Sequence, residues 1–299
     1  MKASQAVSTT ISYLSYAKIN LFLQVLGRRD DGYHNIETIY QTVDLCDELR
    51  FSPRPSEITL ECDDQGLGDP EDNLASKAAA ALKKRTGCTK GVHIELMKRI
   101  PVAAGLAGGS GNAAATLTAL NELWGLDLSE LEIREIGLEL GSDVPYCTVG
   151  GTLAATRRGE RFTTLEPLPE TAFVLVHSAA QVSTARVYSH PLLPKSEEEP
   201  IGDMTPSFKL SIGELQRGAI ADMLYNAMED VVFAEHPELA VLKQRLLDAG
   251  CAGALMSGSG ATLFGLCRNS DHAHEVAAGF SEVETSVVTS VPHGVQRLS

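Results

Sequence analysis

The sequence predicts a mixed α+β fold, and three observations lead to this prediction. Helical and strand-like segments both occur along the chain, without the strict alternation that is typical of a doubly wound parallel sheet. The 299 residues are enough for about two domains of ordinary size. Hydrophobic residues make up 43% and charged residues 21% of the chain, a balance typical of a globular protein. A chain of this length buries enough surface to fold without disulfides or a structural metal.

The first half of the chain is expected to be rich in strands. Residues 11–26 and 36–51 are rich in β-branched and aromatic residues, and the turn-forming segment DGYHN lies between them. Residues 71–85 begin with acidic and end with basic side chains, as the helix dipole favours. The other elements expected here are a strand at 91–100, a glycine-rich loop running into a helix at 101–126, a helix at 128–140 and a hairpin with a linker at 150–170.

The second half is expected to contain more helices. The expected elements are a strand at 173–178, a helix at 183–190, a polar loop at 191–206, helices at 220–230 and 236–249, a strand–turn–strand at 251–267, a helix at 271–280 and a strand at 283–290. The polar first ten residues are expected to form a frayed leader.

Charge and cysteine content restrict the partners and the compartment. There are 25 Lys and Arg against 39 Asp and Glu, a net charge of −14, which disfavours nucleic acid and anionic membranes as partners. An anionic metabolite would need a local pocket built against this overall charge. The six cysteines are scattered with no C-x-x-C pair, and the chain has neither a secretory h-region nor an apolar run long enough to span a bilayer. We therefore expect a soluble, cytoplasmic protein.

The segment PVAAGLAGGSGN at 101–112 is the strongest local signal for a ligand site. Small residues before a helix bring backbone N–H groups together, and these donors with the helix dipole suit a phosphate. The segment matches neither the P-loop, because the chain has no Gly-Lys dipeptide, nor the dinucleotide fingerprint. The alternative is a flexible turn capped by Ser110 or Asn112. Taken singly, Asp143 in GSDVPY suits a helix cap and Lys18 a surface lysine in a strand.

Taken together, these segments resemble a known family. The order of AKINLFLQVLGRRDDGYHNIETIYQTVDL (17–45), EDNL (71–74), GLAGGSGNAA (105–114), LGSDVPY (140–146) and MSGSGATLFGL (256–266) is similar to the GHMP kinase superfamily, and within it to the 4-diphosphocytidyl-2-C-methyl-D-erythritol kinases. The DGYH stretch is the specific part. The resemblance implies a two-domain α+β fold with the substrate cleft between residues 1–160, which would bind ATP and catalyse, and residues 161–299.

The resemblance also implies the catalytic pair. Asp143 would be the base that deprotonates the 2-hydroxyl of the methylerythritol group, and Lys18 its charge partner. Because the two residues are far apart in the sequence, the interpretation requires the fold to bring them together. Asn20 lies two residues after Lys18, on the same face of a strand, and would position the pair or the substrate.

ATP is the expected cosubstrate, with Mg²⁺ to offset the charge on its phosphates. The resemblance places the phosphates in the loop Pro101, Val102, Ala103, Ala104, Gly105, Leu106, Ala107, Gly108, Gly109, Ser110, Gly111 and Asn112. It places the nucleoside near Asp72, Asn73 and Lys98, and it assigns no protein ligands to the metal. Three alanines, at 103, 104 and 107, stand where the family has more glycines, and Gly111 replaces a common serine. Alanine is disfavoured wherever the loop needs a positive φ.

For the acceptor, Tyr33 and His34 match the cytosine-binding dipeptide of the family. Tyr188, after Thr184, is expected to be a second aromatic ring around the base. The turn of Ser257, Gly258, Ser259 and Gly260 is expected under the phosphates or the diphosphate bridge. The resulting expectation is a kinase of isoprenoid precursor synthesis that acts on small molecules as a monomer or weak dimer.

Two other functions remain open on the sequence. One is a GHMP kinase for another small alcohol, such as homoserine or mevalonate, against which Tyr33 and His34 argue. The other is an inactive relative that binds nucleotide and regulates a partner, against which the presence of both Lys18 and Asp143 argues.

Overall fold

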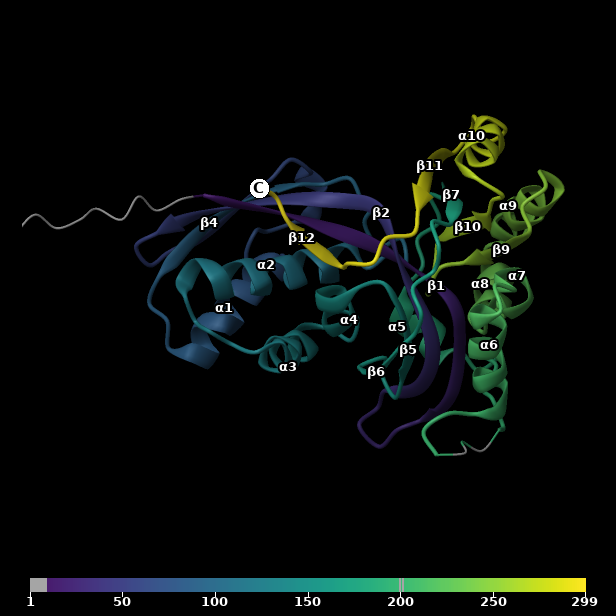
Figure 1. Cartoon of the computed structure of the whole chain (residues 1–299), viewed down its shortest axis with the longest axis horizontal. Coiled ribbons are helices and arrows are strands. Elements are labelled where there is room, and N and C mark those ends of the chain that lie inside the picture. Colours follow the sequence, from purple (N-terminus) through teal and green to yellow (C-terminus); the bar gives the residue numbers. More distant parts are fainter. Residues whose placement is uncertain (1–9, 199, 201) are drawn as a thin grey trace, which may run out of the picture.

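The computed structural model describes residues 10–198, 200 and 202–299, so nine of the ten residues of the expected leader lie outside the described part. Two β-sheets, each covered by helices, form the two halves of the molecule (Figure 1). This arrangement confirms the predicted mixed fold without strict alternation of helices and strands. Within the described residues, no helix combines the length and the apolar character that a membrane crossing needs.

The first sheet is built around one long hairpin. Its eight strands are β1 (Ile11–Arg28), β2 (His34–Arg54), β3 (Ile58–Cys62), β4 (Gly91–Met97), β5 (Thr152–Thr156), β6 (Arg161–Thr164), β8 (Tyr225–Asn226) and β12 (Val295–Arg297). β1 and β2 pair antiparallel along almost their whole length, with three irregularities in the register. The hairpin curves from one half of the molecule into the other, where β8 pairs with β1 (Figure 1). It therefore links the two halves and carries residues of both strands to their junction.

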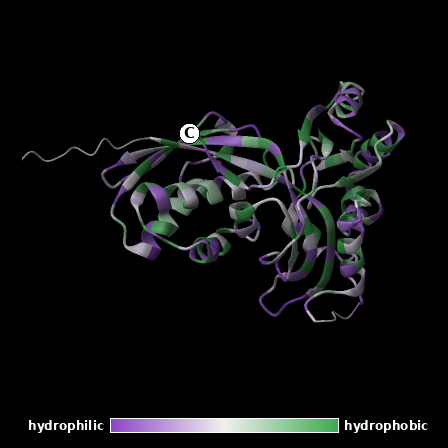
Figure 2. Ribbon diagram, in the orientation of Figure 1, coloured by the Kyte–Doolittle hydropathy of each residue, from purple (hydrophilic) through white to green (hydrophobic). Residues whose placement is uncertain are grey.

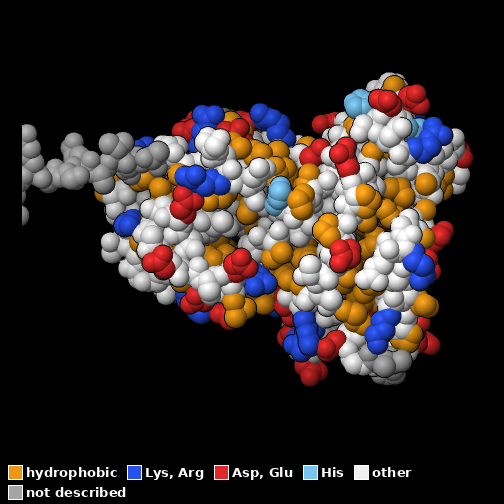
Figure 3. All heavy atoms as spheres, in the orientation of Figure 1, with side chains coloured by type: hydrophobic (Ala, Val, Ile, Leu, Met, Phe, Trp, Pro, Cys, Tyr) orange, Lys and Arg blue, Asp and Glu red, His pale blue; other side chains and the backbone are white. Residues whose placement is uncertain are grey.

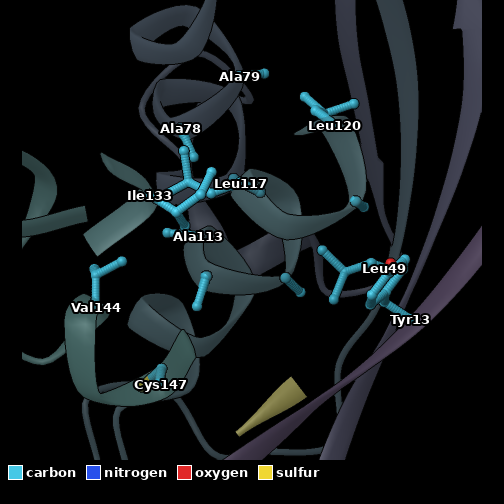
Figure 4. Close-up of a cluster of buried hydrophobic side chains, with 14 of the residues drawn as sticks. Tyr13, Leu49, Ala78, Ala79, Ala113, Leu117, Leu120, Ile133, Val144 and Cys147 are labelled. Atoms are coloured by element: carbon cyan, nitrogen blue, oxygen red, sulfur yellow. The ribbon is translucent and has the colours of Figure 1, made fainter. Parts of the chain in front are cut away.

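Four helices pack on the first sheet: α1 (Leu74–Thr86), α2 (Gly108–Trp124), α3 (Glu130–Leu140) and α4 (Val144–Val149), with a 3₁₀ turn, η1 (Gln65–Leu67), before them. Ala78 and Ala79 of α1 and Ala113 of α2 are fully buried (Figure 4). Such small side chains let the two helices approach closely. Leu117 and Leu120 of α2 are also fully buried in this core, together with aromatic and aliphatic side chains of the sheet (Figure 4). This packing fixes α2, and therefore the loop before it, relative to β1.

The second sheet has the order β11-β7-β10-β9 and is entirely antiparallel. Its strands are β7 (Ala172–His177), β9 (Gly253–Met256), β10 (Thr262–Leu266) and β11 (Glu284–Thr289). The helices of this half are α5 (Thr184–Ser189), α6 (Pro206–Gln216), α7 (Ile220–Met223), α8 (Glu229–Glu235), α9 (Pro237–Asp248) and α10 (Ser270–Ala278). Every residue of β7 is buried. The outer helices carry both hydrophobic and hydrophilic residues, as expected of helices with one face on a sheet (Figure 2).

The expected domain boundary at 160/161 does not coincide with the boundary between the two sheets. β6 begins at Arg161 but pairs with β5, and β12, at the C-terminal end, pairs with β1. The first and the last strand of the expected second domain, β6 and β12, therefore belong to the first sheet. The chain crosses between the halves more than once.

One expectation for the second half is wrong, and one helix was not expected. The helix expected at 220–230 is instead α7, the short strand β8 and α8, because Asn226 donates to the carbonyl oxygens of Met256 and Gly258 and its strand pairs with β1. These tertiary hydrogen bonds override local helix propensity. The sequence analysis also missed α6, although Thr205 caps it and Pro206 opens it, a recognisable start signal.

Candidate active site

Two adjoining cavities meet at the junction of the two halves. The larger has a volume of about 860 Å³ and is lined by β1, β2, the loop before α2, the residues before α4, and α5. The smaller, about 340 Å³, lies between the start of α1 and the glycine-rich loop. Ala103, Gly105, Ala107 and Ser110 line both cavities. The glycine-rich loop therefore forms a wall common to both cavities, each of which is large enough for part of a small ligand.

The fold brings Lys18 and Asp143 together in the larger cavity. Lys18 comes from the middle of β1 and Asp143 directly precedes α4, and Lys18 Nζ lies 3.8 Å from Asp143 Oδ2. The Lys18 side chain is almost wholly buried, whereas a third of the Asp143 side chain is exposed. The carboxylate is thus the member of the pair that an entering molecule can reach.

The ammonium of Lys18 is held from two sides. It donates to Asn20 Oδ1 at 2.7 Å and to the carbonyl oxygen of Gly105 at 2.8 Å. Asn20 Nδ2 donates to Thr38 Oγ1 at 2.8 Å, which fixes the amide with its oxygen towards Lys18. Burial lowers the pKa of Lys18 below its usual 10.5, and the negative charge of Asp143 opposes this shift. The amide oxygen of Asn20 therefore positions Lys18, and the amide nitrogen is held by Thr38.

Asp143 occupies the N-cap position of α4, but its side chain makes no capping hydrogen bond. Its Oδ1 instead accepts a hydrogen bond from the hydroxyl of Tyr40 at 3.0 Å. Tyr40 is buried and stacks on Tyr146 with ring centroids 4.4 Å apart. Burial, and then the charge of Asp143, raises the pKa of Tyr40 well above 10.0, so its hydroxyl stays protonated and donates. The carboxylate is oriented into the cavity rather than onto the helix.

The glycine-rich loop opens α2 without a side-chain cap. Ala107 is the N-cap, in the left-handed region with φ 57°, and no side chain accepts from the first helical N–H groups. Ser110 and Asn112 therefore do not cap this helix, contrary to the alternative considered from the sequence. Ala103 also has a positive φ, of 54°, so two of the three alanines stand where glycine is favoured. Ser110, in the first turn of α2, lines both cavities, and Gly108 and Gly109 line the smaller one.

Two residues assigned to the phosphate loop do not line either cavity. Leu106 is buried in the hydrophobic core, and Gly111 packs against Ser15, whose Oγ would lie 2.5 Å from a Cβ at this position. A Cβ at 111 would require the Ser15 hydroxyl to move, and its next nearest neighbour would be the Tyr16 carbonyl oxygen at 3.4 Å. Asn112 is buried in the wall of the smaller cavity, and its Oδ1 has no hydrogen-bond partner among the described residues.

Asp72, Asn73 and Lys98 line the smaller cavity, as the sequence analysis requires of a shared site. Asn73 also caps α1 through its Oδ1. Lys98 forms an ion pair with Asp47, which is fully buried and also accepts from the backbone N–H groups of Arg99 and Ile100 at 2.7 and 2.8 Å. Asp47 was not recognised from the sequence. It anchors the chain directly before the glycine-rich loop.

Aromatic residues lie at the other end of the larger cavity. Tyr33, in the turn between β1 and β2, is half exposed, and the guanidinium of Arg158 lies over its ring at 3.7 Å from the centroid. His34 and Tyr188 stack directly on each other with centroids 5.2 Å apart. Arg158 therefore covers one face of the half-exposed Tyr33, whereas Tyr188 is covered by His34 and also packs against the hydrophobic core of the second half.

The turn after β9 contributes unequally to the cavity. Gly258 and Ser259 line it, and Ser259 Oγ lies 2.7 Å from Thr184 Oγ1. Ser257 is fully buried, and its hydroxyl donates to the carbonyl oxygen of Gly105 at 3.0 Å. Gly260 does not line the cavity either, because it packs on Met256. Ser257 and Gly260 thus shape the turn and hold it against the glycine-rich loop.

The larger cavity is cationic although the chain as a whole is acidic. Four cationic side chains and one carboxylate line it: Lys18, Arg28, Arg158, Lys195 and Asp143. On the outer face shown in Figure 3, acidic and basic side chains are interspersed. The cavity is therefore the local anion-attracting pocket that a net charge of −14 makes necessary for an anionic ligand.

Comparison with known proteins identifies the family. Residues 73–151 match the family described as "GHMP kinases N terminal domain", and residues 211–284 match the family described as "GHMP kinases C terminal". A 4-diphosphocytidyl-2-C-methyl-D-erythritol kinase of Pelotomaculum thermopropionicum is 40% identical over 284 residues, which cover 94% of this chain and 97% of that protein. One of Exiguobacterium sibiricum is 43% identical, covering 90% and 93% of the two chains. The chain belongs to the 4-diphosphocytidyl-2-C-methyl-D-erythritol kinases.

Solved structures agree with this family. A crystal structure of a 4-(cytidine 5'-diphospho)-2C-methyl-D-erythritol kinase has a TM-score of 0.79 and 33% identity, covering 93% of this chain and 98% of that one. Homoserine kinase from Cytophaga hutchinsonii, at 20% identity and a TM-score of 0.72, shares the fold. The resemblance to the GHMP kinases found from the motifs is thereby confirmed.

Three residues of the site were not predicted from the sequence: Tyr40, Asp47 and Arg158. Tyr40 lies in an apolar strand, where an aromatic residue is usually core. Arg158 lies in the turn between β5 and β6, where an arginine is usually a solvated surface residue. Asp47, an acid inside a strand, was the one visible signal, since a buried carboxylate needs partners.

Proposed function

We propose that this kinase transfers the γ-phosphoryl group of ATP to the 2-hydroxyl of 4-diphosphocytidyl-2-C-methyl-D-erythritol, giving the 2-phosphate and ADP in non-mevalonate isoprenoid precursor synthesis. The observation that carries the proposal is the near full-length identity of about 40% to kinases named for this acceptor. The convergence of a carboxylate and an ammonium beside an uncapped glycine-rich helix start supplies the chemistry that such a transfer needs.

In the proposed reaction, Asp143 accepts the proton of the 2-hydroxyl as its oxygen attacks the γ-phosphorus. Oδ1 already accepts from Tyr40, so Oδ2 is the oxygen free to take the proton. The charge of Lys18, 3.8 Å from Oδ2, stabilises negative charge on the transferring group. Asn20 acts one step away, by fixing the Lys18 ammonium.

On the nucleotide side, we propose that the phosphates lie at the start of α2 and the nucleoside in the smaller cavity, near Asp72, Asn73 and Lys98. Phosphate at an uncapped helix N-terminus meets free N–H donors and the positive end of the dipole. We further propose that Mg²⁺ arrives with ATP and offsets phosphate charge. The described residues contain no cluster of three His, Cys, Asp or Glu side chains. Phosphate oxygens would therefore be its main ligands, and the hydroxyl of Ser110, which lines both cavities, is an oxygen donor at the start of α2.

On the acceptor side, we propose that the cytosine stacks on the uncovered face of Tyr33 and contacts His34, with Tyr188 beside it. Stacking of a base on an aromatic side chain is worth about 1–3 kcal/mol, enough to distinguish a cytidine conjugate from the free polyol. The cationic lining suits the negative charge of the diphosphate.

An assay of ADP release with a panel of alcohols tests the proposal. 4-Diphosphocytidyl-2-C-methyl-D-erythritol should be turned over, and homoserine, mevalonate, galactose and free methylerythritol should give rates at the no-acceptor background. Turnover of another alcohol with no response to the cytidine conjugate would favour a different GHMP kinase. Absence of turnover with every acceptor, together with retained ATP binding, would favour a nucleotide-binding regulator.

A further inference from the structure

Arg158 spans the distance between the aromatic turn and the reacting carboxylate. Its guanidinium lies over the ring of Tyr33 at 3.7 Å, and its Nη2 lies 3.4 Å from the hydroxyl of Ser142, the residue before Asp143. Under the proposed function, cytosine binds at the first of these places and the 2-hydroxyl at the second. The diphosphate joins those two parts of the acceptor, so it has to pass Arg158.

Arg158 also has unused hydrogen-bonding capacity. It forms no ion pair within the described part of the chain, although it lines a cavity of an acidic protein. Its Nε is buried and has no hydrogen-bond partner among the residues that the structure describes. A buried guanidinium donor without a partner is costly, so a ligand that supplies anionic oxygens would be bound strongly there.

The other three cations of the cavity are placed for other tasks. Lys18 is occupied by Asn20 and Gly105 and faces Asp143. Arg28 and Lys195 lie close enough to His34 for their positive charges to add to the effect of burial in lowering its pKa, which places them at the cytosine end. Arg158 is therefore the cation in the middle of the cavity.

The local backbone fixes Arg158 relative to the carboxylate. Its N–H donates to Glu160 Oε2 at 2.8 Å within the turn between β5 and β6. The next residue, Gly159, has φ 102°, and a Cβ there would lie 2.7 Å from the hydroxyl of Tyr40. Only glycine fits this approach, and it presses the turn against the side chain that orients Asp143. The backbone beside Arg158 thus lies against the hydroxyl that orients Asp143.

We propose that Arg158 binds the diphosphate bridge of the acceptor and makes this kinase select a nucleoside-diphosphate ester over an uncharged cytidine derivative. The inference rests on the proposed function. The planar guanidinium presents two parallel N–H donors to phosphate oxygens, a geometry that a lysine does not reproduce. Arg158 acts as a specificity-determining residue through binding, and takes no part in the proton transfer.

The test compares Arg158→Met with wild type and with Arg157→Met, a matched control that removes the same charge from the adjacent, exposed position. Calorimetry measures the binding of cytidine diphosphate and of cytidine, and the ADP-release assay gives KM for the acceptor and for ATP. For Arg158→Met, the affinity for cytidine diphosphate should fall about 10- to 100-fold and the acceptor KM should rise similarly. Cytidine affinity and the KM for ATP should stay within about twofold of wild type. Arg157→Met should match wild type throughout.

A second variant separates charge from geometry. Arg158→Lys should recover only part of the lost affinity for cytidine diphosphate, because it keeps the charge and loses the planar pair of donors. Equal losses of cytidine and cytidine diphosphate in Arg158→Met would overturn the inference, since Arg158 would then act through Tyr33. A folded Arg158→Met variant indistinguishable from Arg157→Met would also overturn it. Failure of the proposed function is seen separately, as wild-type protein that does not phosphorylate the cytidine conjugate.

Discussion

Replacing Tyr40 by Phe removes one hydroxyl from the carboxylate proposed as the base. The ring remains, so stacking on Tyr146 is kept, and the lost contact is the 3.0 Å hydrogen bond to Asp143 Oδ1. A hydrogen bond to a charged group contributes about 1.5–3 kcal/mol. The lower end applies because a third of the Asp143 side chain is exposed and water replaces part of the contact. At about 1.4 kcal/mol per factor of ten, kcat should fall about tenfold.

The ADP-release assay with both substrates varied measures this effect, and Tyr146→Phe is its control. The Tyr146 hydroxyl is also buried, but it donates to the carbonyl oxygen of Gly151 at 2.8 Å and bonds to Thr42, away from Asp143. Tyr146→Phe should therefore lower the free energy of unfolding by about 1–3 kcal/mol and leave kcat near wild type. Tyr40→Phe should do the reverse, with a small stability change and both KM values within about twofold. A kcat for Tyr40→Phe within twofold of wild type would refute the positioning role.

Three further substitutions test the proposed roles. Asp143→Asn should lower kcat by about 10²–10⁴-fold with both substrates still bound, because the amide keeps the shape and loses the basicity; retained turnover would rule out Asp143 as the base. Tyr33→Ala should raise the acceptor KM roughly 5- to 150-fold and leave that of ATP nearly unchanged; equal rises in both would contradict stacking of the cytosine. Lys18→Met should abolish most turnover, and the melting temperature of the wild type should rise relative to that of the variant between pH 7 and pH 10. Burial lowers the pKa of Lys18, so the cost of holding its charge is present below the folded-state pKa and disappears as pH rises towards 10.5; a constant difference would show that another contact is responsible.

The segments with strong periodicity or strong start signals could be predicted from sequence. The helix α1, with its basic last turn, and the strand-rich β1 and β2 are found close to the expected places. The helix expected at 220–230 failed because Asn226 forms hydrogen bonds to a turn 30 residues later, which no local pattern reveals. The pairing of β12 with β1, a strand from the other end of the chain, is likewise not visible in any local pattern.

Within the site, the motifs indicated which segments contribute residues, but they did not indicate what each residue does. Ser257 and Ser259 are indistinguishable in the segment MSGSG, yet one is buried against the glycine-rich loop and the other lines the cavity. Leu106 and Gly111 belong to the loop motif but face the core and β1. Which side of a loop faces a ligand depends on the surface against which the loop packs, and that surface comes from distant segments.

By itself, the sequence determined the family, the glycine-rich start of α2 and the two residue types required for phosphoryl transfer, because these depend on local order and side-chain chemistry. Only the tertiary structure decided that Tyr40 donates a hydrogen bond to Asp143 and that Asn20 accepts one from Lys18. It also decided that Arg158 lies beside Ser142. Those relations are distances between segments far apart along the chain. They are set by the packing of the two sheets and their helices, where hydrogen bonds and close contact fix side chains that no local pattern relates.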